Sequence, residues 1–587
     1  MKILFVNPAC LDKRITNEDA GVVPIGIYYM AALLLEKGFD ARILNLAAPG
    51  TDKDTSKDTV QTFRAMIKKE KPDLVGFSVT NPTRFNAVAC AKEARTLLPQ
   101  TCIVFGGPAP TFMPGHFFKV CPQIDIMVKG EGEATILSIV QALANTKFLE
   151  SESIETKSIH NGSVPLALAR KIKGIAFCEK GKMIETGPAK PIQDLDSLVH
   201  PSAYFVYQHL SMSRGCPGKC TFCGSPKFWG NTNIRRHSAL WFAEELLALA
   251  QKGVTHFYIS DDTFTMDRER VIDFCKILIA ADPHITWNAI SRVDYIDKEL
   301  LFWMRRAGCL QISFGVESGA QKIKKTLGKP VADEACIKAF FLTRSHGILP
   351  RAYFIYGSPG ETDETIQDSC DLMMQLKPLG TVFYLLVVFP GTHLYDHARQ
   401  KGLVTDKVWQ QPIEDLPWFE LDETLDFPRV KAFGDKLRQA FFENLSHFAY
   451  EIDLVEEKAL TPFHADFLSR LAMTFSHGEY AGDTRIKETD KIAEHLFTRA
   501  LSYSPHPRAF MGIALLLQKQ KQFSQAKSRL AQGLAHFPGN KDLSVCMGVC
   551  LMNQAQFKEA LPFFTPFREE PGMDHYINIC NSQERTT

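Results

Sequence analysis

The sequence predicts an α/β protein with two successive α/β domains and an all-helical C-terminal region. Short apolar runs of strand length alternate with amphipathic stretches of helix length as far as about residue 415. Beyond that point strand-like runs fade and helical periodicity takes over. At 587 residues the chain is too long for one hydrophobic core, which agrees with several domains.

The first region, residues 1–150, contains five short apolar runs that we interpret as parallel strands of a doubly wound, Rossmann-like sheet. The runs are MKILFVNPA, DARILNL, DLVGFSVT, CIVFGGPAP and IDIMVKGEGE, and helical stretches separate them. Ligands of such sheets bind beyond the carboxyl ends of the strands. Small or polar residues at these ends leave room for a large, flat ligand: Pro8, Ser78, Thr80, Gly106, Gly107, Gly130 and Glu131. The absence of G-x-G-x-x-G weakens a dinucleotide interpretation.

Residues 151–200 are predicted as a small hairpin followed by an extended connector. Residues 201–415 then contain six strand-like runs, from YQHLSMSRG to GTVFYLLVVFPG, with amphipathic stretches between them. Six βα units predict an open partial (β/α)6 barrel with its chemistry at the carboxyl ends of the strands.

Polar residues and a glycine-rich turn follow these predicted strands: Asp261, Asp262, Asn288, Arg292, Glu317, Ser318 and the segment that begins at Gly357. Structural roles remain open for several of them. The two aspartates are equally suited to capping the next helix, and Arg292 to a structural ion pair. Glu317 follows an apolar strand, so we expect it to have a partner.

Three cysteines, Cys216, Cys220 and Cys223, stand within eight residues as C-x3-C-x2-C. A zinc site would need a second cysteine pair, and no other C-x2-C occurs in the chain. A disulfide would leave one thiol over. Three thiolates suit a [4Fe–4S] cluster that holds three irons and leaves the fourth open to a ligand with adjacent amine and carboxylate groups. The alternative is that the three cysteines are incidental.

This motif, with Phe222 before its last cysteine, resembles the signature of the radical S-adenosylmethionine (SAM) superfamily. The resemblance implies that the free iron binds SAM and that an external electron donor of flavodoxin or ferredoxin type reduces the cluster. SAM is then cleaved to methionine and a 5′-deoxyadenosyl radical. It also implies that Asp261 and Asp262 lie at the methionine amino group, that Glu317 and Ser318 contact ribose and methionine, and that the Gly357 segment approaches adenine.

The first region, with PIGIYYMAALL, GGPAPTFMP and KGEGEAT, is similar to the cobalamin-binding domain that precedes many radical SAM cores. The two resemblances together span about residues 1–415. The motif D-x-H-x-x-G, whose histidine binds cobalt in many cobalamin proteins, is missing. The resemblance therefore implies cobalamin without a protein histidine beneath the cobalt. A degenerate domain retained for packing is the alternative.

A helical linker is predicted at 416–485, and residues 486–587 contain an internal repeat. Ala493, Ala526 and Ala560 recur at a spacing of 33–34 residues, with a proline at the end of each helix pair. This pattern resembles tetratricopeptide repeats. Such repeats either cap the core or present a groove to a protein partner.

Composition limits the class of protein. The chain has 67 basic and 66 acidic residues, which gives no reason to expect a nucleic-acid partner. The longest apolar runs are half the length of a membrane span, and the N-terminus lacks the pattern of a signal peptide. Fifteen cysteines without a paired framework indicate a reducing compartment, so we expect a cytoplasmic protein.

From the two resemblances, the sequence is interpreted as a cobalamin-dependent radical SAM enzyme, most simply a methyltransferase. Its substrate would be a small molecule or a peptide, and a second SAM would remethylate the cobalt. One alternative is a cyclase or rearrangement enzyme without net methylation, and another is a cobalamin-responsive scaffold or sensor. A methylthiotransferase fits less well, because Cys10, Cys90, Cys102 and Cys121 lack cluster spacing.

Overall fold

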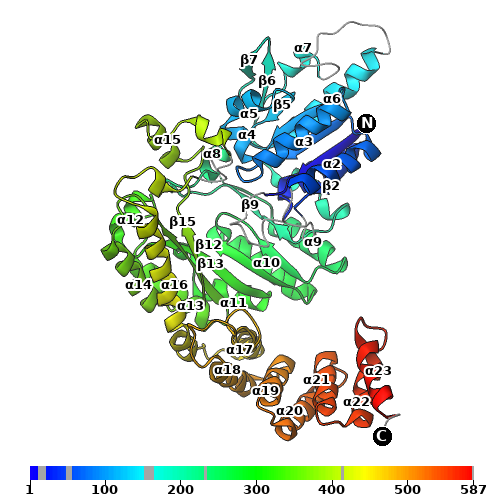
Figure 1. Ribbon diagram of the computed structural model, residues 1–587, viewed down its shortest axis with the longest axis vertical. Coiled ribbons are helices and arrows are strands. Elements are labelled where there is room, and N and C mark those ends of the chain that lie inside the picture. Colours follow the sequence, from blue (N-terminus) through cyan, green and yellow to red (C-terminus); the bar gives the residue numbers. More distant parts are fainter. Residues whose placement is uncertain (11–21, 48–55, 151–163, 231–233, 412–415, 585–587) are drawn as a thin grey trace.

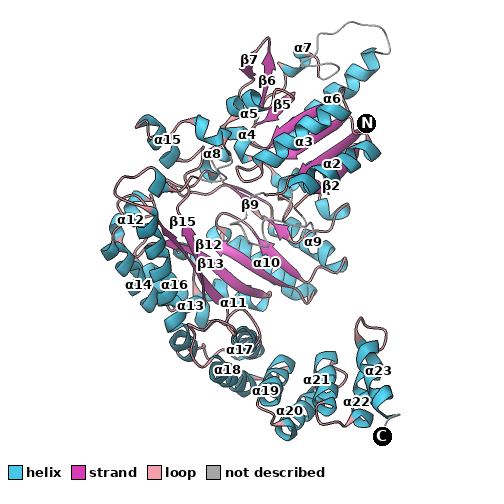
Figure 2. Ribbon diagram, viewed as in Figure 1, coloured by secondary structure: helices cyan, strands magenta, loops and turns pink. Residues whose placement is uncertain are grey.

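The computed structural model describes residues 1–10, 22–47, 56–150, 164–230, 234–411 and 416–584. An α/β domain at the N-terminus, an open β/α barrel and a curved series of helices follow one another along the molecule (Figure 1). In the part of the chain that is described, strands are confined to the first two regions (Figure 2). The predicted order of α/β domains and helical region is therefore observed.

The N-terminal domain is built on a sheet of seven strands: β1 (Lys2–Asn7), β2 (Asp40–Asn45), β3 (Leu74–Ser78), β4 (Cys102–Gly106), β5 (Ile126–Val128), β6 (Ile175–Glu179) and β7 (Lys182–Glu185). Their order is β2-β1-β3-β4-β5-β6-β7, and the first five are parallel. Chain order reverses between β1 and β3, the place where doubly wound sheets bind ligands.

Helices cover both faces of this sheet. They are α1 (Ile25–Glu36), α2 (Ser56–Glu70), α3 (Arg84–Leu97), α4 (Pro108–Phe112), α5 (Pro114–Val120), α6 (Glu133–Glu150) and α7 (Leu166–Ala169). Alternate residues of β1 show how the layers form. Ile3 and Phe5 pack in the core shared with α1 and α6, whereas Leu4 and Val6 pack in the core shared with α2 and α3.

The predicted hairpin at 175–185 extends this sheet. β6 pairs antiparallel with β5, and β7 pairs antiparallel with β6. The side chains of Ile175 and Phe177 are buried in the core shared with α1 and α6, and that of Ala176 is buried in the core on the opposite face. The hairpin thus belongs structurally to the first domain, and the extended connector begins after it.

The central region contains a parallel six-stranded sheet: β8 (His209–Leu210), β11 (His256–Ile259), β12 (Thr286–Ser291), β13 (Cys309–Glu317), β14 (Leu349–Tyr356) and β15 (Gly380–Leu385). Their order is β15-β14-β13-β12-β11-β8. The two end strands do not pair with each other, so the barrel is open, as the six predicted units imply. A separate antiparallel pair joins β9 (Ser213–Arg214) to β10 (Arg235–Arg236).

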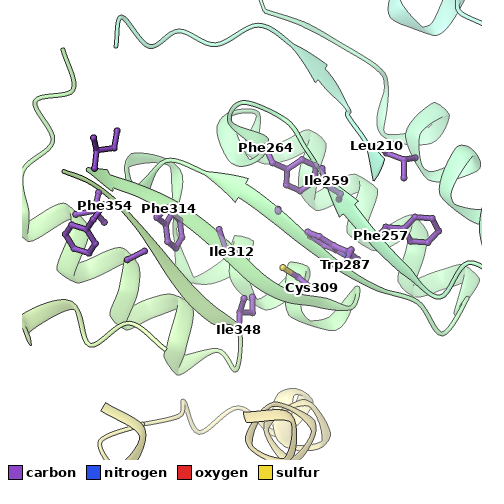
Figure 3. Close-up of a cluster of buried hydrophobic side chains, with 14 of the residues drawn as sticks. Leu210, Phe257, Ile259, Phe264, Trp287, Cys309, Ile312, Phe314, Ile348 and Phe354 are labelled. Atoms are coloured by element: carbon purple, nitrogen blue, oxygen red, sulfur yellow. The ribbon is translucent and has the colours of Figure 1, made fainter. Parts of the chain in front are cut away.

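Helices pack on the outer face of this sheet. The helices of the region are α8 (Ser225–Phe228), α9 (Ala239–Gln251), α10 (Arg268–Ala281), α11 (Lys298–Arg306), α12 (Gln321–Thr326), α13 (Asp333–Ser345), α14 (Asp363–Leu376) and α15 (His393–Gln400). Figure 3 shows part of the core beneath them, to which Leu210, Phe257, Trp287, Ile312 and Phe354 contribute from five neighbouring strands. Burial of these large side chains leaves the opposite face of the sheet for polar residues.

After β15 the chain crosses back to the first domain. Arg84 of α3 is buried, and its guanidinium donates to the carbonyl oxygens of Trp409 at 3.3 Å and Gln411 at 2.9 Å. The backbone N–H of Val388 donates to the carbonyl of Leu416 at 2.8 Å. We call residues 386–411 the crossing segment. It ties the barrel to the N-terminal domain.

The C-terminal helices are α16 (Phe427–Tyr450), α17 (Thr461–Ser476), α18 (Thr489–Tyr503), α19 (Pro507–Lys519), α20 (Phe523–His536), α21 (Lys541–Met552), α22 (Phe557–Phe564) and α23 (Met573–Glu584). α16 packs on α14, β14 and β15, and from α17 onward each helix packs against the next. Gly512 and Gly548 permit close packing, since a Cβ on them would lie 2.1 Å from the ring of Phe497 and 2.3 Å from that of Phe564.

One end of this helical series is joined to the barrel by a buried ionic contact. Arg305 of α11 donates to the carboxylate of Asp466 in α17 at 2.7 Å, and Arg508 of α19 donates to the same carboxylate at 2.9 Å. The series therefore begins at α17, within the residues predicted as a linker. No described helix has the length and apolar character needed to cross a membrane.

Candidate active site

The three cysteines of the motif lie on a loop, which we call the cysteine loop (215–224), between β9 and α8. The loop is held to the barrel through Thr221. Its backbone N–H donates to the carbonyl of Leu327 at 2.9 Å, its hydroxyl donates to the carbonyl of Thr326 at 3.0 Å, and its own carbonyl accepts from the N–H of Leu394 at 2.9 Å. These contacts fix the loop from both sides. The Sγ of Cys216 also accepts from the Gly218 N–H at 3.4 Å and lies 3.6 Å from the hydroxyl of Thr263.

Two of the three thiols, those of Cys216 and Cys220, lie next to Gly218. A Cβ at this position would lie 3.3 Å from the Sγ of Cys216, a tight contact, and 3.6 Å from that of Cys220, an ordinary one. All three motif cysteines are half-buried, unlike Cys275 and the other fully buried thiols of the core. A ligand can therefore reach them.

The chemistry of the loop fits an iron cluster. Burial raises the pKa of Cys220, and that of Cys223 to about 11, so the thiolate forms need a bound cation to stabilise them. Among the described residues no three His, Cys, Asp or Glu side chains are close enough to share a single ion. The thiol of Cys223 is close enough to those of Cys216 and Cys220 for their charges to raise its pKa further, and three neighbouring thiols on one loop suit a cluster.

Charged residues surround Cys220. The carboxylate of Glu317 accepts a hydrogen bond from Lys329 Nζ at 2.7 Å, which supplies the partner expected for this buried group. Glu317 has φ +67°, a left-handed backbone conformation that non-glycine residues adopt mainly where the surroundings impose it. Arg292 forms the structural ion pair foreseen as an alternative, with Asp294 at 2.5 Å, and also lies beside the loop near Gly218.

The two aspartates after β11 differ. Asp261 is fully buried, and its carboxylate accepts hydrogen bonds from the Met212 N–H at 2.8 Å and from the hydroxyl of Ser213. Burial raises the pKa of Asp261 to about 6. Its side chain thus fixes the strand that leads into the cysteine loop. Contact of Asp261 with SAM stays a prediction.

Asp262 faces outward from the same turn. Its carboxylate accepts a hydrogen bond from the Ser225 hydroxyl at 2.5 Å and lines a cavity between the first two domains. The helix-capping alternative is not observed for either aspartate, because Asp267 caps α10 through the N–H of Arg270. Asp262 is therefore the member of the pair that a ligand can reach.

Ser318 and Gly357 occupy turns at the carboxyl edge of the barrel. The hydroxyl of Ser318 lies 3.2 Å from that of Ser369 and accepts from the Ala320 N–H at 3.1 Å. Gly357 has φ +77°, and its N–H donates to Glu361 at 2.5 Å. A Cβ on Gly357 would lie 2.9 Å from Leu385, so this glycine is required by the turn itself. Their predicted contacts with SAM remain predictions.

The interdomain cavity lies between the strand ends of the first domain and the β9–α8 segment of the second. It encloses about 1350 Å³ of empty space, its mouth to solvent included. Most of its lining is apolar or glycine, with a few polar side chains among them. The lining includes the predicted residues Ser78, Gly106, Gly107, Gly130 and Glu131, together with Phe5, Ile27, Tyr29, Val104, Ile136, Arg214, Phe228, Trp229 and Asp262.

Glycines make this cavity deep, although in different ways. A Cβ on Gly106 would meet only Val128, at an ordinary 3.8 Å, so the position opens into free space. Gly107 has φ +100°, and a Cβ there would lie 2.8 Å from the carbonyl oxygen of Val79. Gly26, which lines the cavity from α1, is the most open of the three, because a Cβ there would have no atom within 4 Å. The space fits a large ligand, as the row of small residues predicted.

One wall of the cavity consists of charged and aromatic side chains that join the two domains. Arg214 donates to Glu133 at 2.6 Å and lies 3.4 Å from Glu131, and its guanidinium stands 5.3 Å from the ring centre of Tyr29. Glu131 also pairs with Arg235. Glu131 is thus engaged in domain contacts at the edge of the cavity, and a direct contact with a ligand stays a prediction.

Two of the predicted strand-end residues lie elsewhere. Thr80 lines a second cavity next to the first, and its N–H donates to the hydroxyl of Thr83 at 3.0 Å. Pro8 is not among the described residues that line either cavity. The strand ends fan apart, so residues at equivalent positions do not all meet one ligand.

Sequence reasoning missed several residues of the site. Lys329, which pairs with Glu317, follows a short helix and carried no motif. Trp229 and Phe228 separate the two cavities, and only their position just after the cysteine motif hinted at a role. Asn81, in the second cavity, had a usable signal, since it stands one residue beyond the predicted Thr80.

Comparisons with known proteins agree with this geometry. Residues 210–373 match the family model of the radical SAM superfamily, and residues 19–140 match that of the B12 binding domain. An uncharacterized methyltransferase of Pyrococcus horikoshii is 30% identical over 70% of this chain and 86% of its own length. The anaerobic magnesium-protoporphyrin IX monomethyl ester cyclase of Rubrivivax gelatinosus is 28% identical over 69% of this chain and 71% of its own length.

A solved structure has the same fold. The radical SAM methyltransferase TsrM of Kitasatospora setae, determined with cobalamin and a [4Fe–4S] cluster bound, superposes with a TM-score of 0.56. The match covers 85% of this chain and all of TsrM, at 18% sequence identity. At that identity the likeness concerns the fold, and it extends over both α/β domains.

Proposed function

The chain belongs to the family of radical SAM enzymes that carry a cobalamin-binding domain, and from this membership we propose that it methylates an unactivated carbon of its substrate. It is an enzyme whose cofactors are a [4Fe–4S] cluster, SAM and cobalamin. The substrate is proposed to be a small molecule or a peptide. An external electron donor of flavodoxin or ferredoxin type is proposed to supply the electrons in the cytoplasm.

One observation supports this proposal above the others: the segments directly before and after the cysteine loop line the interdomain cavity. Asp262, Phe228 and Trp229, which follow the barrel strand and the cysteine loop, line the cavity of the first domain. Transfer to a short-lived carbon radical requires that the reacting groups be held close together. The position of the cysteine loop next to the lining of the interdomain cavity is consistent with that requirement.

The residues of the chain have separate tasks in this proposal. Cys216, Cys220 and Cys223 would hold three irons, and the positive charges of Lys329 and Arg292 beside Cys220 offset the charge of the thiolates. When bound, the cluster with SAM supplies a radical that removes hydrogen, and cobalamin supplies a methyl group. The apolar walls of the cavities exclude water from these reactive groups.

The proposal is tested with the full chain reconstituted anaerobically with iron, sulfide and hydroxocobalamin. We would incubate it with a reductant, SAM deuterated in its methyl group and a small-molecule extract of cells that lack the protein. The expected result is a product that carries the labelled methyl group, formed together with 5′-deoxyadenosine. Formation of 5′-deoxyadenosine with no labelled product in any extract would contradict methylation.

A cyclase or rearrangement enzyme is the second candidate, because the Rubrivivax gelatinosus relative is named a cyclase and matches this chain almost as well. The same incubation distinguishes the two. A cyclase would produce 5′-deoxyadenosine and a substrate whose mass falls by lost hydrogen, without the label. A scaffold or sensor would produce neither.

We further propose that α17–α23 form a tetratricopeptide-like groove for a protein partner. Supporting observations are the buried alanines Ala493, Ala526 and Ala560 at 33–34-residue spacing and the close helix contacts at Gly512 and Gly548. Since α17 packs on α18, a truncation should keep both and remove 505–587.

Two results are possible for this truncated chain. If the helices dock a partner, SAM cleavage and iron content should stay unchanged while turnover of the true substrate falls. If they only cap the fold, the truncated chain should lose iron or aggregate. Thermal melting together with iron content distinguishes these results, and the second would contradict docking.

A further inference from the structure

The strands of the open barrel turn alternate side chains away from the surrounding helices. On β13 and β14, Ile312, Phe314, Ala352 and Phe354 lie in the core beneath the helices, and Figure 3 labels three of them. The residues between them therefore point to the opposite side of the sheet. We call this side the inner face, and its members include Asn288, Ile290, Ser313, Arg351, Tyr353 and Tyr384.

The inner face carries one positive charge without a counter-charge. The four strands β12–β15 contain only two charged side chains, Glu317 and Arg351, and Glu317 is paired with Lys329. Arg351 is half-buried, and among the described residues none forms a hydrogen bond or an ion pair with its guanidinium. Its nitrogen atoms are not among the buried, unpartnered atoms of the chain, so they are open to solvent. An anionic ligand can therefore reach this guanidinium and supply the partner that it lacks.

Apolar side chains stand around this charge. Ile290 is 37% exposed and Tyr384 is 46% exposed, although both belong to central strands of the molecule. The rings of Tyr353 and Tyr384 lie edge to face, with their centres 5.5 Å apart. Exposed aromatic and aliphatic groups beside a cation suit a molecule with an apolar or aromatic body and an anionic end.

The inner face leads to the cysteine loop. Tyr353 is in register with Gly315 of β13, and the carboxylate of Glu317 lies over Gly315, since a Cβ there would overlap it. The same carboxylate lies near Cys220. Arg351 comes two residues before Tyr353, which places it about 7 Å deeper along the strand. A small molecule whose anionic end is held by Arg351 would thus extend towards the cysteine loop.

The deep end of this face is bounded by Tyr480, in the segment between α17 and α18. Its side chain is buried, and its hydroxyl donates to the carbonyl of Leu379 at 3.0 Å. A Cβ on Gly380 would lie 3.5 Å from Cγ of Arg351 and 3.9 Å from the Tyr480 hydroxyl oxygen, so the two side chains approach each other at the start of β15. The carboxylate of Glu479, which acts on the same hydroxyl, forms no ion pair with Arg351. The helical region thus limits the depth of the site without neutralising the arginine.

We propose that Arg351 binds a carboxylate or phosphate group of a small-molecule substrate, whose apolar or aromatic body lies along Ile290, Tyr353 and Tyr384. A guanidinium presents paired N–H donors that match either anion. The inference rests on the proposed function, because it names the chemical class of the molecule to be methylated. Its first test measures binding without turnover, so that its failure and a failure of methylation are distinguishable.

The binding test compares three probes that share one aromatic body: 2-naphthylacetate, 2-naphthyl phosphate and the neutral 2-naphthylacetamide. The full chain carries its cluster and is kept without reductant, with SAM and hydroxocobalamin in excess, so that the cofactor sites are filled. Equilibrium dialysis should show saturable binding of at least one anion to the wild type. Arg351→Gln should weaken that binding by at least about tenfold, the scale of a lost hydrogen bond to a charged group, and should change binding of the amide by less than about twofold. The tighter of the two anions identifies the recognised group as carboxylate or phosphate.

Three further variants serve as controls. Arg306 of α11 is also half-buried, but it lies among the outer helices and stacks on Phe302 and Trp303 at 5.2 Å. Arg306→Gln removes the same charge away from the inner face and should leave all three affinities unchanged. Arg351→Lys keeps the charge and should bind the anions more tightly than Arg351→Gln does. Tyr384→Ala removes apolar surface and should weaken all three probes alike.

The labelled product of the extract incubation gives a second test. At pH 7 it should be retained by an anion exchanger, and its yield should fall at least about tenfold in Arg351→Gln while 5′-deoxyadenosine still forms. A labelled product that is neutral or cationic would overturn this inference and leave methylation standing. If no labelled product forms, methylation fails and the binding of the probes alone decides the inference.

Three results of the binding test would also overturn the proposal. One is the absence of saturable binding of either anion to the wild type. Another is an anion affinity that Arg351→Gln leaves unchanged. The third is an equal loss of anion and amide binding in Arg351→Gln with no recovery in Arg351→Lys, which would mean a disturbed fold rather than a lost charge. Thermal melting of both variants checks the fold directly.

Discussion

The cysteine loop and the interdomain cavity are adjacent, yet they depend on opposite features of the sequence. The loop works through side chains that are present, three thiols within eight residues. The cavity exists because side chains are absent, at glycines carried by separate strand ends and by α1. The loop should therefore be destroyed by removing atoms and the cavity by adding them, and the two kinds of change should affect different cofactors.

The largest effect is expected from the loop. Cys220→Ala removes one of three ligands, and the thiols of the surrounding core are buried and cannot replace it, so the cluster should not assemble. Iron content should fall to background, and formation of 5′-deoxyadenosine should drop by at least about a hundredfold, the scale typical of losing an essential catalytic group. Cobalamin absorbance should remain, because the cavity is intact.

A matched control is Cys275→Ala. This thiol is fully buried in α10, so its removal should cost only packing, about 1 kcal/mol in the free energy of unfolding. Iron content and SAM cleavage should equal those of wild type. If Cys220→Ala retained its cluster while Cys275→Ala lost it, the assignment of the loop would be wrong.

The second effect is expected at the cavity. Gly106→Phe places a ring in open space without backbone strain, so cobalamin should no longer bind, whereas the cluster and uncoupled SAM cleavage should persist. Gly106→Ala adds one carbon at an ordinary contact distance and should bind cobalamin as wild type does. Absorbance of bound cobalamin gives the stoichiometry, and iron content gives the control.

Gly107 would be a poor choice for this test, although the sequence singled out both glycines. Any side chain there meets the Val79 carbonyl and a positive φ, so even Gly107→Ala disturbs the backbone. A better second variant is Gly26→Phe, which fills the same cavity from α1. Normal cobalamin binding by both Gly106→Phe and Gly26→Phe would refute the cavity as the cobalamin site.

The sequence predicts local patterns well, and it predicts poorly the features that depend on the rest of the fold. The cysteine spacing is local, and strand runs such as CIVFGGPAP keep their apolar pattern whatever surrounds them, so the loop and both sheets were predictable. The pairing of the 175–185 hairpin with β5 was not, because its own residues suit a free hairpin as well as a sheet edge. The different roles of Gly106 and Gly107 depend on φ, which no residue pattern reveals here.

Partners across the fold were the hardest to predict. A partner for Glu317 was expected because a buried carboxylate needs one, but Lys329 became that partner only through the turn after α12. Asn81 likewise lines the second cavity only because segments near residues 224 and 390 line the same space. Sequence alone identifies the need for a contact more readily than the residue that meets it.

The third effect concerns the buried ion pair of Glu317 and Lys329 beside the cysteine loop. Lys329→Met leaves the Glu317 carboxylate buried without its cation, and both side chains are at most about one-tenth exposed. The free energy of unfolding should fall by about 3 kcal/mol. Lys322→Met, on the exposed side of α12, should change it by less than about 0.5 kcal/mol.

Adding Glu317→Gln to Lys329→Met tests whether the loss comes from the unpaired charge. The double variant should recover part of the stability, since an amide costs less to bury than a carboxylate. Denaturant unfolding of the reconstituted chain measures all three variants. A double variant less stable than Lys329→Met would contradict an uncompensated charge as the cause.

The smallest expected effect is a pH dependence of the free energy of unfolding, which arises from His237 at the wall that joins the two domains. His237, buried beside α9, lies 3.1 Å from the hydroxyl of Tyr29 in α1 and 3.2 Å from the carboxylate of Asp196, and stacks on Trp241 at 3.7 Å between ring centres. Burial, followed by the charge of Arg214, holds the pKa of this imidazole well below its usual range, although Asp196 opposes the shift.

The sign of the effect follows from proton binding. Below the ordinary histidine pKa of about 6.5, the unfolded chain binds a proton that the folded chain does not. His237 therefore contributes its full stability above that pH and loses it on acidification, about 1 kcal/mol between about pH 6.5 and 5.5. His237→Gln keeps hydrogen-bonding groups but cannot titrate, so its melting temperature should fall less over this interval. Parallel curves for the two proteins would contradict a lowered pKa of His237.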